Sequence, residues 1–187
     1  MEIRFANGKK LRLVMGDITQ IRVDALVNAA NSGLHGGGGV DGAVHRAGGS
    51  SLMRELNEIR ARIGSCPAGD AVVTSAGSLP AQYVFHAVGP IFQDGRHDEP
   101  LQLKSCYQRC LQLAEERDLR SISFPAISTG AYGYPPAEAA DIALHTVAEH
   151  LQSPECGVRE VLFVLFDRHA YDIHAAVALR DFRSSVQ

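Results

Sequence analysis

A run of four glycines with a polar residue near each end is the segment of this sequence most suited to chemistry. Residues 28–49 read NAANSGLHGGGGVDGAVHRAGG, with Asn31 before the run and Asp41 just after it, where a helix is expected to begin. Glycine-rich backbone leading into a helix presents unpaired N–H groups, and the helix dipole adds to their attraction for an anion. A carboxylate such as that of Asp41 can act as a general base beside a bound water. The segment therefore predicts a phosphate-binding loop with a candidate base at its far end.

Two common nucleotide motifs do not account for this segment. Gly37, Gly39 and Gly42 match G-x-G-x-x-G, but the dinucleotide-binding form of that motif needs its first glycine directly after a strand and an acidic residue ending the next strand. Here residues 31–36 intervene, and the next expected strand, AVVTSAG, carries no acid. No Gly-Lys-Ser/Thr sequence follows the glycines, so a P-loop is excluded as well.

A second segment, FPAISTGAYGYPP at 124–136, has the same place between an expected strand and an expected helix. Ser128, Thr129, Gly130 and Gly133 offer hydroxyls and unobstructed amides to phosphate oxygens. Loops at the carboxyl ends of parallel strands lie along one edge of a sheet, where ligands bind. Two anion-compatible loops on one edge suit a diphosphate.

The elements that must position these loops alternate along the chain. Strands are expected at 25–29, 71–74, 83–88, 122–124 and 160–166, and helices at 41–47, 51–62, 101–116, 136–151 and 169–182. Such alternation is typical of a mostly parallel sheet covered on both faces. The opening EIRFANGKKLRLVMGD alternates apolar and polar residues around Asn7-Gly8, which predicts an antiparallel hairpin with a type I′ turn. The sequence thus predicts a single-domain, three-layer α/β/α sandwich, residues 1–187, with a mixed, mostly parallel sheet.

Composition narrows the classes of partner. A net charge of −3 and the absence of a basic cluster larger than Lys9-Lys10 argue against nonspecific nucleic-acid binding, which needs many cationic contacts. No apolar run is long enough for a membrane span and no signal peptide is recognisable, so we expect a cytoplasmic protein with no membrane partner. The four cysteines form no CxxC pair, and the eight histidines form no HExxH motif, so neither a disulfide framework nor a metal site is expected.

Five short motifs, in order along nearly the whole chain, resemble those of macrodomains of the MacroD type. The resemblance runs from about residue 11 to residue 180. The motifs are GDIT (16–19), NAAN (28–31), GGGGVDGAVHRAGG (36–49), HAVGP (86–90) and STGAYGYP (128–135).

This resemblance implies the macrodomain fold and an ADP-ribose-binding cleft at the top of the sandwich. MacroD-type proteins hydrolyse O-acetyl-ADP-ribose and remove mono-ADP-ribose from aspartate and glutamate side chains, without a metal or other cofactor. The implied partners are ADP-ribose, its O-acyl esters and mono-ADP-ribosylated proteins. Nucleic acid is not expected except as an ADP-ribosylated substrate, and a monomer is expected. A non-catalytic ADP-ribose reader is the alternative, and an RNA-associated regulatory protein is disfavoured by the lack of a basic stripe.

The resemblance also implies residue roles. Asp17 would accept from the adenine amine with Ile18 beside it, and Phe166 would stack on adenine. Asn31 and Asp41 would address the distal ribose. The diphosphate would lie between Gly37, Gly38, Gly39 and Val40 in one loop and Ser128, Thr129, Gly130, Ala131 and Tyr132 in the other.

Some of these roles have simpler alternatives. Either Asp41 or the substrate's own phosphate could take the proton from water, and Asp41 could serve only as a helix N-cap. Asn31 could be an Asx-turn residue that ends a strand. Phe166 could belong to the core, because VLFVLF reads as a buried strand.

Overall fold

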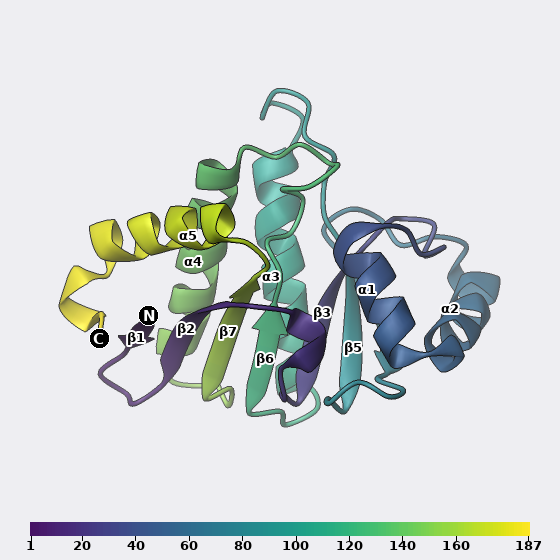
Figure 1. Ribbon diagram of the computed structural model, residues 1–187, viewed down its shortest axis with the longest axis horizontal. Helices are drawn as coiled ribbons and strands as arrows, with labels where there is room; N and C mark the ends of the chain where they lie inside the picture. The colour runs from purple at the N-terminus through teal and green to yellow at the C-terminus, as the bar shows by residue number, and fades with distance from the viewer.

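The structure of the protein is a computed structural model that describes residues 1–187 around a seven-stranded sheet (Figure 1). The strands lie in the order β1-β2-β7-β6-β3-β5-β4. They are β1 (Glu2–Arg4), β2 (Lys10–Met15), β3 (Ala25–Ala30), β4 (Ala71–Ser75), β5 (Tyr83–Val88), β6 (Ser121–Phe124) and β7 (Glu160–Leu165). Four of the six strand pairings are parallel, and the β1–β2 and β4–β5 pairings are antiparallel. The predicted mixed, mostly parallel sheet is confirmed.

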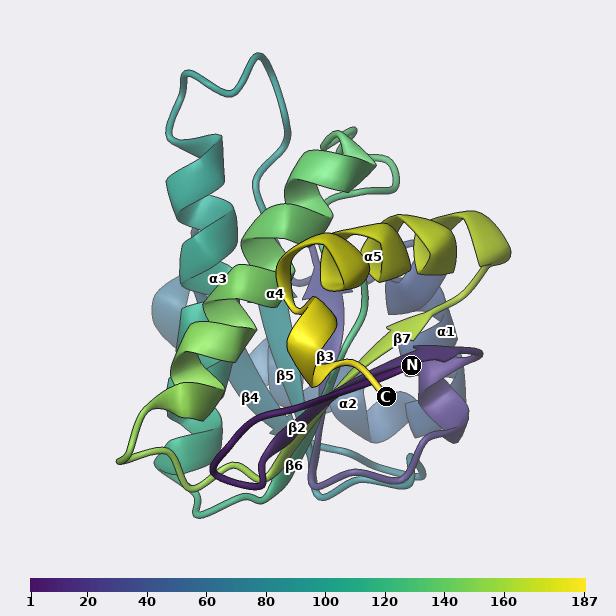
Figure 2. The same ribbon diagram turned by 90° about the vertical axis from the view of Figure 1, so that its left-hand side faces the viewer.

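Helices cover both faces of this sheet. They are α1 (Gly39–Gly48), α2 (Ser50–Ile63), α3 (Glu99–Glu115), α4 (Pro136–Gln152) and α5 (Arg168–Asp181), with short 3₁₀ turns at Ile18–Gln20 and Arg183–Ser185. The helices α3, α4 and α5 form one layer, and α1 and α2 lie on the other side of the sheet (Figures 1 and 2). The predicted three-layer sandwich is therefore confirmed. None of these helices combines the length and apolar character that crossing a bilayer would require.

Apolar residues bury both faces of the central strands. The largest core cluster holds 36 buried residues and joins the sheet to α3, α4 and α5, while a cluster of 10 joins the sheet to α1 and α2. In β3, five of the six residues are buried, as expected for a parallel strand with a helical layer on each side. Because both faces of these strands are packed, the loops after β3 and β6 start at fixed positions on the edge of the sheet.

The strands β3 and β6 are neighbours, and the chain leaves them towards opposite sides of the sheet. From β3 the chain continues towards β5 and β4, whereas from β6 it crosses through α4 to β7. The two strands pair only at Ala25↔Ile122 and Leu26↔Ser123, at the amino end of β3 and the middle of β6. Beyond these pairs they share no ladder, and a strand-order switch point of this kind is where open α/β sheets bind ligands.

The predicted antiparallel pairing of this hairpin is confirmed, but the predicted turn type is wrong. In the β1–β2 turn only Gly8 has a positive φ, +82°, whereas a type I′ turn needs positive φ at both central residues. The turn is instead closed by bonds from the Gly8 N–H to the Phe5 carbonyl and from the Phe5 N–H to the Lys9 carbonyl. The strands β1 and β2 pair antiparallel, and β2 pairs in parallel with β7, so β1 is the strand that runs against the rest of the sheet at this edge. The other antiparallel strand is β4, which a short connection joins directly to β5.

Candidate active site

A cleft of about 410 Å³ opens where β3 and β6 separate. It brings together the two loops that the sequence singled out, although they lie almost a hundred residues apart. Its walls are the ends of β3 and β5, the glycine loop with the first turn of α1, and the loop after β6. The lining residues are Ala29, Ala30, Asn31, Gly37, Gly38, Gly39, Val40, Asp41, Gly89, Ala126, Ile127, Ser128, Gly130, Ala131 and Tyr132.

Asn31 shapes the glycine loop through its side chain. Its Oδ1 accepts from the His35 N–H at 3.1 Å, and its Nδ2 donates to the Gly36 carbonyl at 3.0 Å. The Asx-type alternative therefore describes part of its role in the structure. Asn31 also lines the cleft, so its loop-shaping bonds hold it at the ligand-facing surface.

The helix α1 begins two residues earlier than expected, at Gly39, with Gly38 as its N-terminal capping position. Asp41 is the third residue of the helix, and its carboxylate accepts from a side chain of β3 rather than from the N–H groups of the first turn. The N-cap alternative for Asp41 is therefore wrong. The N–H groups of a first helical turn have no acceptor within the helix, so those of Gly39 and Val40 face the cleft end of α1.

Close packing holds the glycine loop against α1. A Cβ on Gly42 would lie 2.7 Å from the Gly37 carbonyl oxygen, a distance that real Cβ contacts do not reach. Gly42 therefore needs its missing side chain to let the loop fold back on the helix. The same close approach keeps the Asp41 carboxylate at the wall of the cleft beside Gly37.

The loop after β6 has free hydrogen-bond donors for the acceptor atoms of a ligand. The backbone N–H groups of residues 128–132 donate to no protein acceptor. Ser128 has a positive φ of +66°, which is uncommon for a non-glycine residue, and its buried Oγ has no hydrogen-bond partner. A strained, buried residue with an unpaired hydroxyl is a site where a ligand can complete the hydrogen bonding.

Gly89, after β5, is shaped to fit this loop. A Cβ there would meet the Ser128 Oγ at 2.1 Å and the Ile127 side chain at 2.6 Å. A side chain at 89 would therefore push the loop out of place. Tyr134, which follows the loop, is buried in the core, with only 1% of its surface exposed.

A chain of buried polar side chains runs under Asp41 across three strands. The Asn28 amide Nδ2 lies 2.7 Å from Asp41 Oδ1 and 3.1 Å from His86 Nδ1. His86 Nε2 lies 2.9 Å from Thr74 Oγ1, which in turn donates to the Ser75 carbonyl. The two strand residues are brought together by the parallel register, which pairs Asn28 directly with His86.

The donors in this chain can be assigned from chemistry. Because Nδ2 of Asn28 only donates, His86 Nδ1 must accept, and the ring proton then lies on Nε2 and points to Thr74. Burial, with a smaller effect of His45, lowers the pKa of His86 to about 3, so its ring is neutral at physiological pH. Both Asn28 N–H bonds are therefore used, and one of them fixes the Asp41 carboxylate.

His45 lies one helical turn after Asp41 and faces the same carboxylate. Its Nε2 is 3.3 Å from Asp41 Oδ1, without the alignment of a hydrogen bond. Its ring lies 6.0 Å from that of His86, centroid to centroid. The clusters of potential metal ligands in the protein contain neither Asp41 nor any other residue of the cleft lining.

Four predicted site residues do not line the cleft. Thr129 donates its hydroxyl to the Ala126 carbonyl within the loop. Ile18 is 5% exposed and packs in the core cluster against α1. Asp17 and Phe166 lie just beyond the ends of β2 and β7, whose last residues, Met15 and Leu165, pair directly. They therefore occupy the same edge of the sheet as the cleft, Phe166 two strands and Asp17 three strands away from β3.

The side chains of Asp17 and Phe166 are exposed to solvent and do not belong to the core. Phe166 is 79% exposed, so the core alternative for this residue is wrong, and the strand ends one residue before it. Asp17 is exposed, and its Oδ1 accepts from the N–H and hydroxyl of Thr19. Its other carboxylate oxygen remains free to accept from a ligand.

The sequence analysis assigned no role to Asn28, Thr74, His86 or Gly89. The available signal was polarity inside otherwise apolar strands, since Asn28, Thr74 and His86 are all almost fully buried. Buried polar side chains need partners, so three of them in strands of one sheet indicate a network. Which residue they serve could be learned only from the strand register.

The fold and the cleft define an α/β protein with a ligand site at a switch point of its sheet, built from two loops rich in free N–H groups. Residues 27–143 match the family model of the Macro domain. The chain belongs to the macrodomain family.

Named relatives agree with this assignment. The chain is 50% identical over 166 residues to O-acetyl-ADP-ribose deacetylase 1 of Pantoea vagans, which covers 89% of this chain and 96% of the relative. Its structure superposes on an Oceanobacillus iheyensis macrodomain with ADP at a TM-score of 0.92, with 40% identity over 100% of this chain and 97% of the other. A Trypanosoma brucei macrodomain in complex with ADP-ribose matches at a TM-score of 0.81 and 38% identity, over 89% and 68% of the two chains.

Proposed function

We propose that this protein binds ADP-ribose and hydrolyses its esters, releasing acetate from O-acetyl-ADP-ribose and mono-ADP-ribose from aspartate and glutamate side chains of proteins. The observation that carries the proposal is the Asp41 carboxylate, held by Asn28 at the wall of a cleft whose other wall offers free N–H groups. The names of relatives that are about half identical to this chain support the deacetylase activity. The protein-directed activity rests on the shared ester chemistry.

The diphosphate would lie between the two loops. The N–H groups at the start of α1 and those of residues 128–132 have no acceptor within the protein, and Ser128 adds a hydroxyl that is also unpaired. Such donors, together with the dipole of α1, hold a dianion without a basic side chain. This geometry explains how a chain with a net charge of −3 can bind an anionic ligand.

The two ends of the ligand would then meet different chemistry. Asn31 and Asp41 lie at the glycine loop and would address the distal ribose, with Asn31 orienting a hydroxyl. Adenine would extend along the sheet edge towards Asp17 and Phe166. The exposed ring of Phe166 offers an apolar face for stacking.

In the reaction, a water molecule attacks the ester carbonyl carbon. Asp41 accepts a proton from the water as the new C–O bond forms. The bond from the carbonyl carbon to the ribose oxygen then breaks, and that oxygen takes up a proton as acid and alcohol separate. Asn28 holds the Asp41 carboxylate in place throughout, because its amide is itself fixed by His86.

The test is incubation of purified, metal-stripped protein with O-acetyl-ADP-ribose, followed by measurement of ADP-ribose release. We expect turnover in the wild type and a loss of at least about 100-fold in Asp41→Asn, with ADP-ribose binding retained by calorimetry. Asp172→Asn, an exposed aspartate on α5, is the matched control. A parallel assay with a glutamate-ADP-ribosylated protein tests the second substrate class.

Two outcomes would contradict the proposal. Full turnover in Asp41→Asn would remove Asp41 as the base and leave the substrate phosphate in that role. No release by the wild type, with ADP-ribose binding intact, would make the protein a reader of ADP-ribose instead of a hydrolase.

A further inference from the structure

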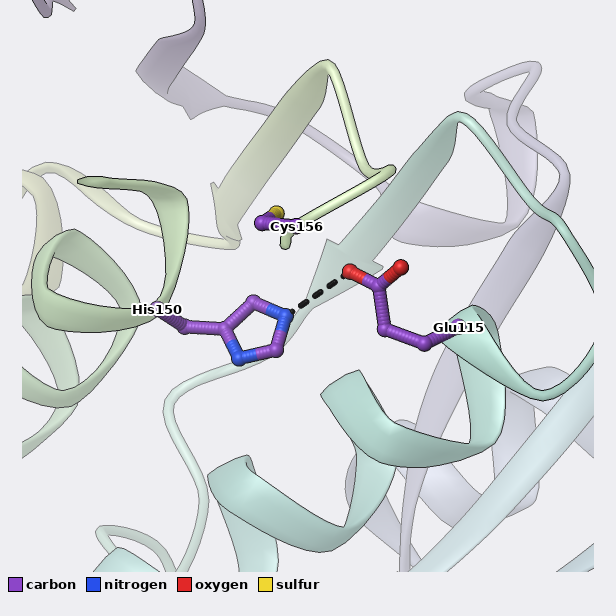
Figure 3. A group of neighbouring side chains, drawn as sticks. All are labelled: Glu115, His150 and Cys156. Atoms are coloured by element: carbon purple, nitrogen blue, oxygen red, sulfur yellow. Dashed lines mark hydrogen bonds and ion pairs between the residues drawn. The ribbon is translucent and has the colours of Figure 1, made fainter. Parts of the chain in front are cut away.

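Three side chains with metal-binding chemistry meet at the edge of the sheet opposite the cleft. Glu115 is the last residue of α3, His150 lies in the last turn of α4, and Cys156 lies in the segment that leads into β7 (Figure 3). The Glu115 carboxylate, a ring nitrogen of His150 and the Cys156 sulfur all lie within 4.8 Å of one another. None of these three residues lines the cleft, and none takes part in the proposed hydrolysis.

The spacing of these atoms is close to that of a tetrahedral metal site. The His150 Nε2 lies 2.9 Å from Glu115 Oε1. Bonds of about 2.0–2.3 Å to zinc place neighbouring ligand atoms about 3.3–3.6 Å apart. The nitrogen and the oxygen would need to separate slightly, and the sulfur, which lies within 4.8 Å of both, would need to leave the Val158 carbonyl and come closer to them.

The donor set is specific in its chemistry. One thiol, one imidazole and one carboxylate combine the ligand types that zinc binds in proteins. The side chains of His150 and Glu115 keep 25% and 28% of their surface exposed, which leaves a path for an ion and room for a water ligand. Cys156 is 9% exposed, so the sulfur forms the inner wall of the site.

The carboxylate is oriented by backbone groups around it. Glu115 Oε2 accepts from the Gly157 N–H at 2.8 Å, and a Cβ on Gly157 would lie only 3.0 Å from that oxygen. The glycine therefore allows the carboxylate to approach the chain beside Cys156. Hydrogen bonds of this kind are what orient the ligands in known metal sites.

The two other clusters of potential ligands are less suited. Asp94, His97 and Glu99 lack a thiol, and Glu99 is already occupied by four backbone N–H groups. Asp141, His145 and Asp181 also lack sulfur, and Arg180 bonds to both carboxylates. Only the Glu115 cluster offers three different donor types without a competing cation in direct contact.

We propose that Glu115, His150 and Cys156 form a zinc-binding site, with water as the fourth ligand. The ion would join the ends of α3 and α4 to the segment before β7, and so tie together three elements that are distant in sequence. The site is separate from the cleft, so the ion contributes to stability and not to ester hydrolysis. In the metal-free protein, burial and Glu115 raise the pKa of the Cys156 thiol, while the Lys9 ammonium opposes them. Zinc binding would displace the proton of this thiol.

The test is titration of the metal-stripped full chain with Zn²⁺ and, separately, with Co²⁺. Zinc at about 100 times its Kd should raise Tm by about 5–10 °C for a chain of this size. Cobalt should give the near-ultraviolet charge-transfer absorption that a thiolate ligand produces. Both responses should be lost in Cys156→Ala and in His150→Ala, two variants that remove different ligands.

His145→Ala is the matched control, since it removes an exposed histidine of the same helix and should keep both responses. Circular dichroism of each metal-free variant verifies that it is folded. The proposal is overturned if wild-type protein shows no cobalt–thiolate band, if the band survives in Cys156→Ala, or if His145→Ala abolishes the zinc response. Esterase turnover in metal-stripped protein is the independent readout of the cleft, and it should not depend on zinc.

Discussion

The side-chain amide of Asn28 lies 2.7 Å from the Asp41 carboxylate and links it to the buried ring of His86. The position of the candidate base thus depends on Asn28 on β3, His86 on β5 and Thr74 on β4. None of these three side chains lines the cleft. A carboxylate held in this way keeps one orientation relative to a bound water. Such positioning affects the chemical step more than it affects binding.

This relationship predicts that His86→Leu lowers kcat by about tenfold or more while the Kd for ADP-ribose changes little. The substitution leaves the second Asn28 N–H and the Thr74 hydroxyl without their ring partner. Each unsatisfied buried group costs about 1–3 kcal/mol, so Tm falls as well. Steady-state kinetics and calorimetry on the same preparation separate the two effects.

A matched control is His174→Leu, which replaces another buried histidine, 2% exposed, on α5. It loses one hydrogen bond to the Ala170 carbonyl and should lower Tm without changing kcat. Equal losses of kcat in the two variants would show that His86 acts only through stability.

Alanine substitutions at Gly89 and Gly130 should affect thermal stability and ADP-ribose affinity differently. A Cβ at 89 meets Ser128 at 2.1 Å, so Gly89→Ala should displace the loop after β6, lower Tm and weaken ADP-ribose binding. At Gly130 a Cβ meets no atom within 4 Å and φ is not positive, so Gly130→Ala should leave Tm unchanged. Because Gly130 lines the cleft, its new methyl group should still reduce affinity.

Thermal unfolding and calorimetry of both alanine variants test this pair. An unchanged affinity in Gly89→Ala would mean that the position of Ser128 does not matter to the ligand. A large fall of Tm in Gly130→Ala would show that the loop has less free space than its geometry indicates.

Much of the fold followed from patterns that need no long-range information. The alternation of apolar runs with helical segments predicted the sandwich, and Pro136 at the first position of α4 marked a helix start correctly. The antiparallel direction of β4 was not predictable in this way, because strand direction depends on which neighbour a strand meets. The β1–β2 turn failed for a local reason, since Asn7 does not adopt the positive φ that Asn-Gly often favours.

The candidate site was predictable only as far as the two loops. Glycine, serine and their place after strands indicated where an anion could bind, and the structure brings these loops to one cleft. The support under Asp41 was not predictable, because Asn28 and His86 are 58 residues apart and meet only through the register of β3 and β5. The strained backbone of Ser128 likewise depends on packing against Gly89, in another element.

Glu99 predicts a pH dependence of stability. Burial opposes its ionisation, but N–H groups of Gln93, His97 and Asp94 bond to it and lower its pKa to about 2. A carboxyl group with a lowered folded-state pKa stabilises the protein above its unfolded-state pKa, here about 4.5, and loses that effect as pH falls towards 2. The free energy of unfolding should therefore fall between pH 4.5 and pH 2 more steeply in wild type than in Glu99→Gln.

Urea unfolding at several pH values checks this, with Glu58→Gln as a control at an exposed glutamate that makes no hydrogen bond or ion pair. The effect bears on the cleft, because the segment that Glu99 holds begins at Gln93, directly after Phe92, whose N–H donates to the Tyr132 carbonyl. Parallel pH profiles for wild type and Glu99→Gln would contradict the assignment.

Phe166 predicts a loss of affinity without a loss of stability. Its ring is 79% exposed after the end of β7, so removing it uncovers no core, and Phe166→Ala should leave Tm nearly unchanged. If the ring stacks on adenine, its removal costs about 1–3 kcal/mol, which is about a 5- to 150-fold rise in Kd.

Calorimetry with ADP-ribose, and with ribose 5-phosphate, which has no adenine, separates stacking from other effects: only ADP-ribose should bind more weakly. Leu101→Ala, at a leucine that is 67% exposed on α3, is the control for loss of an exposed apolar side chain. An unchanged Kd for ADP-ribose in Phe166→Ala would contradict stacking of adenine on Phe166 and place adenine away from the end of β7.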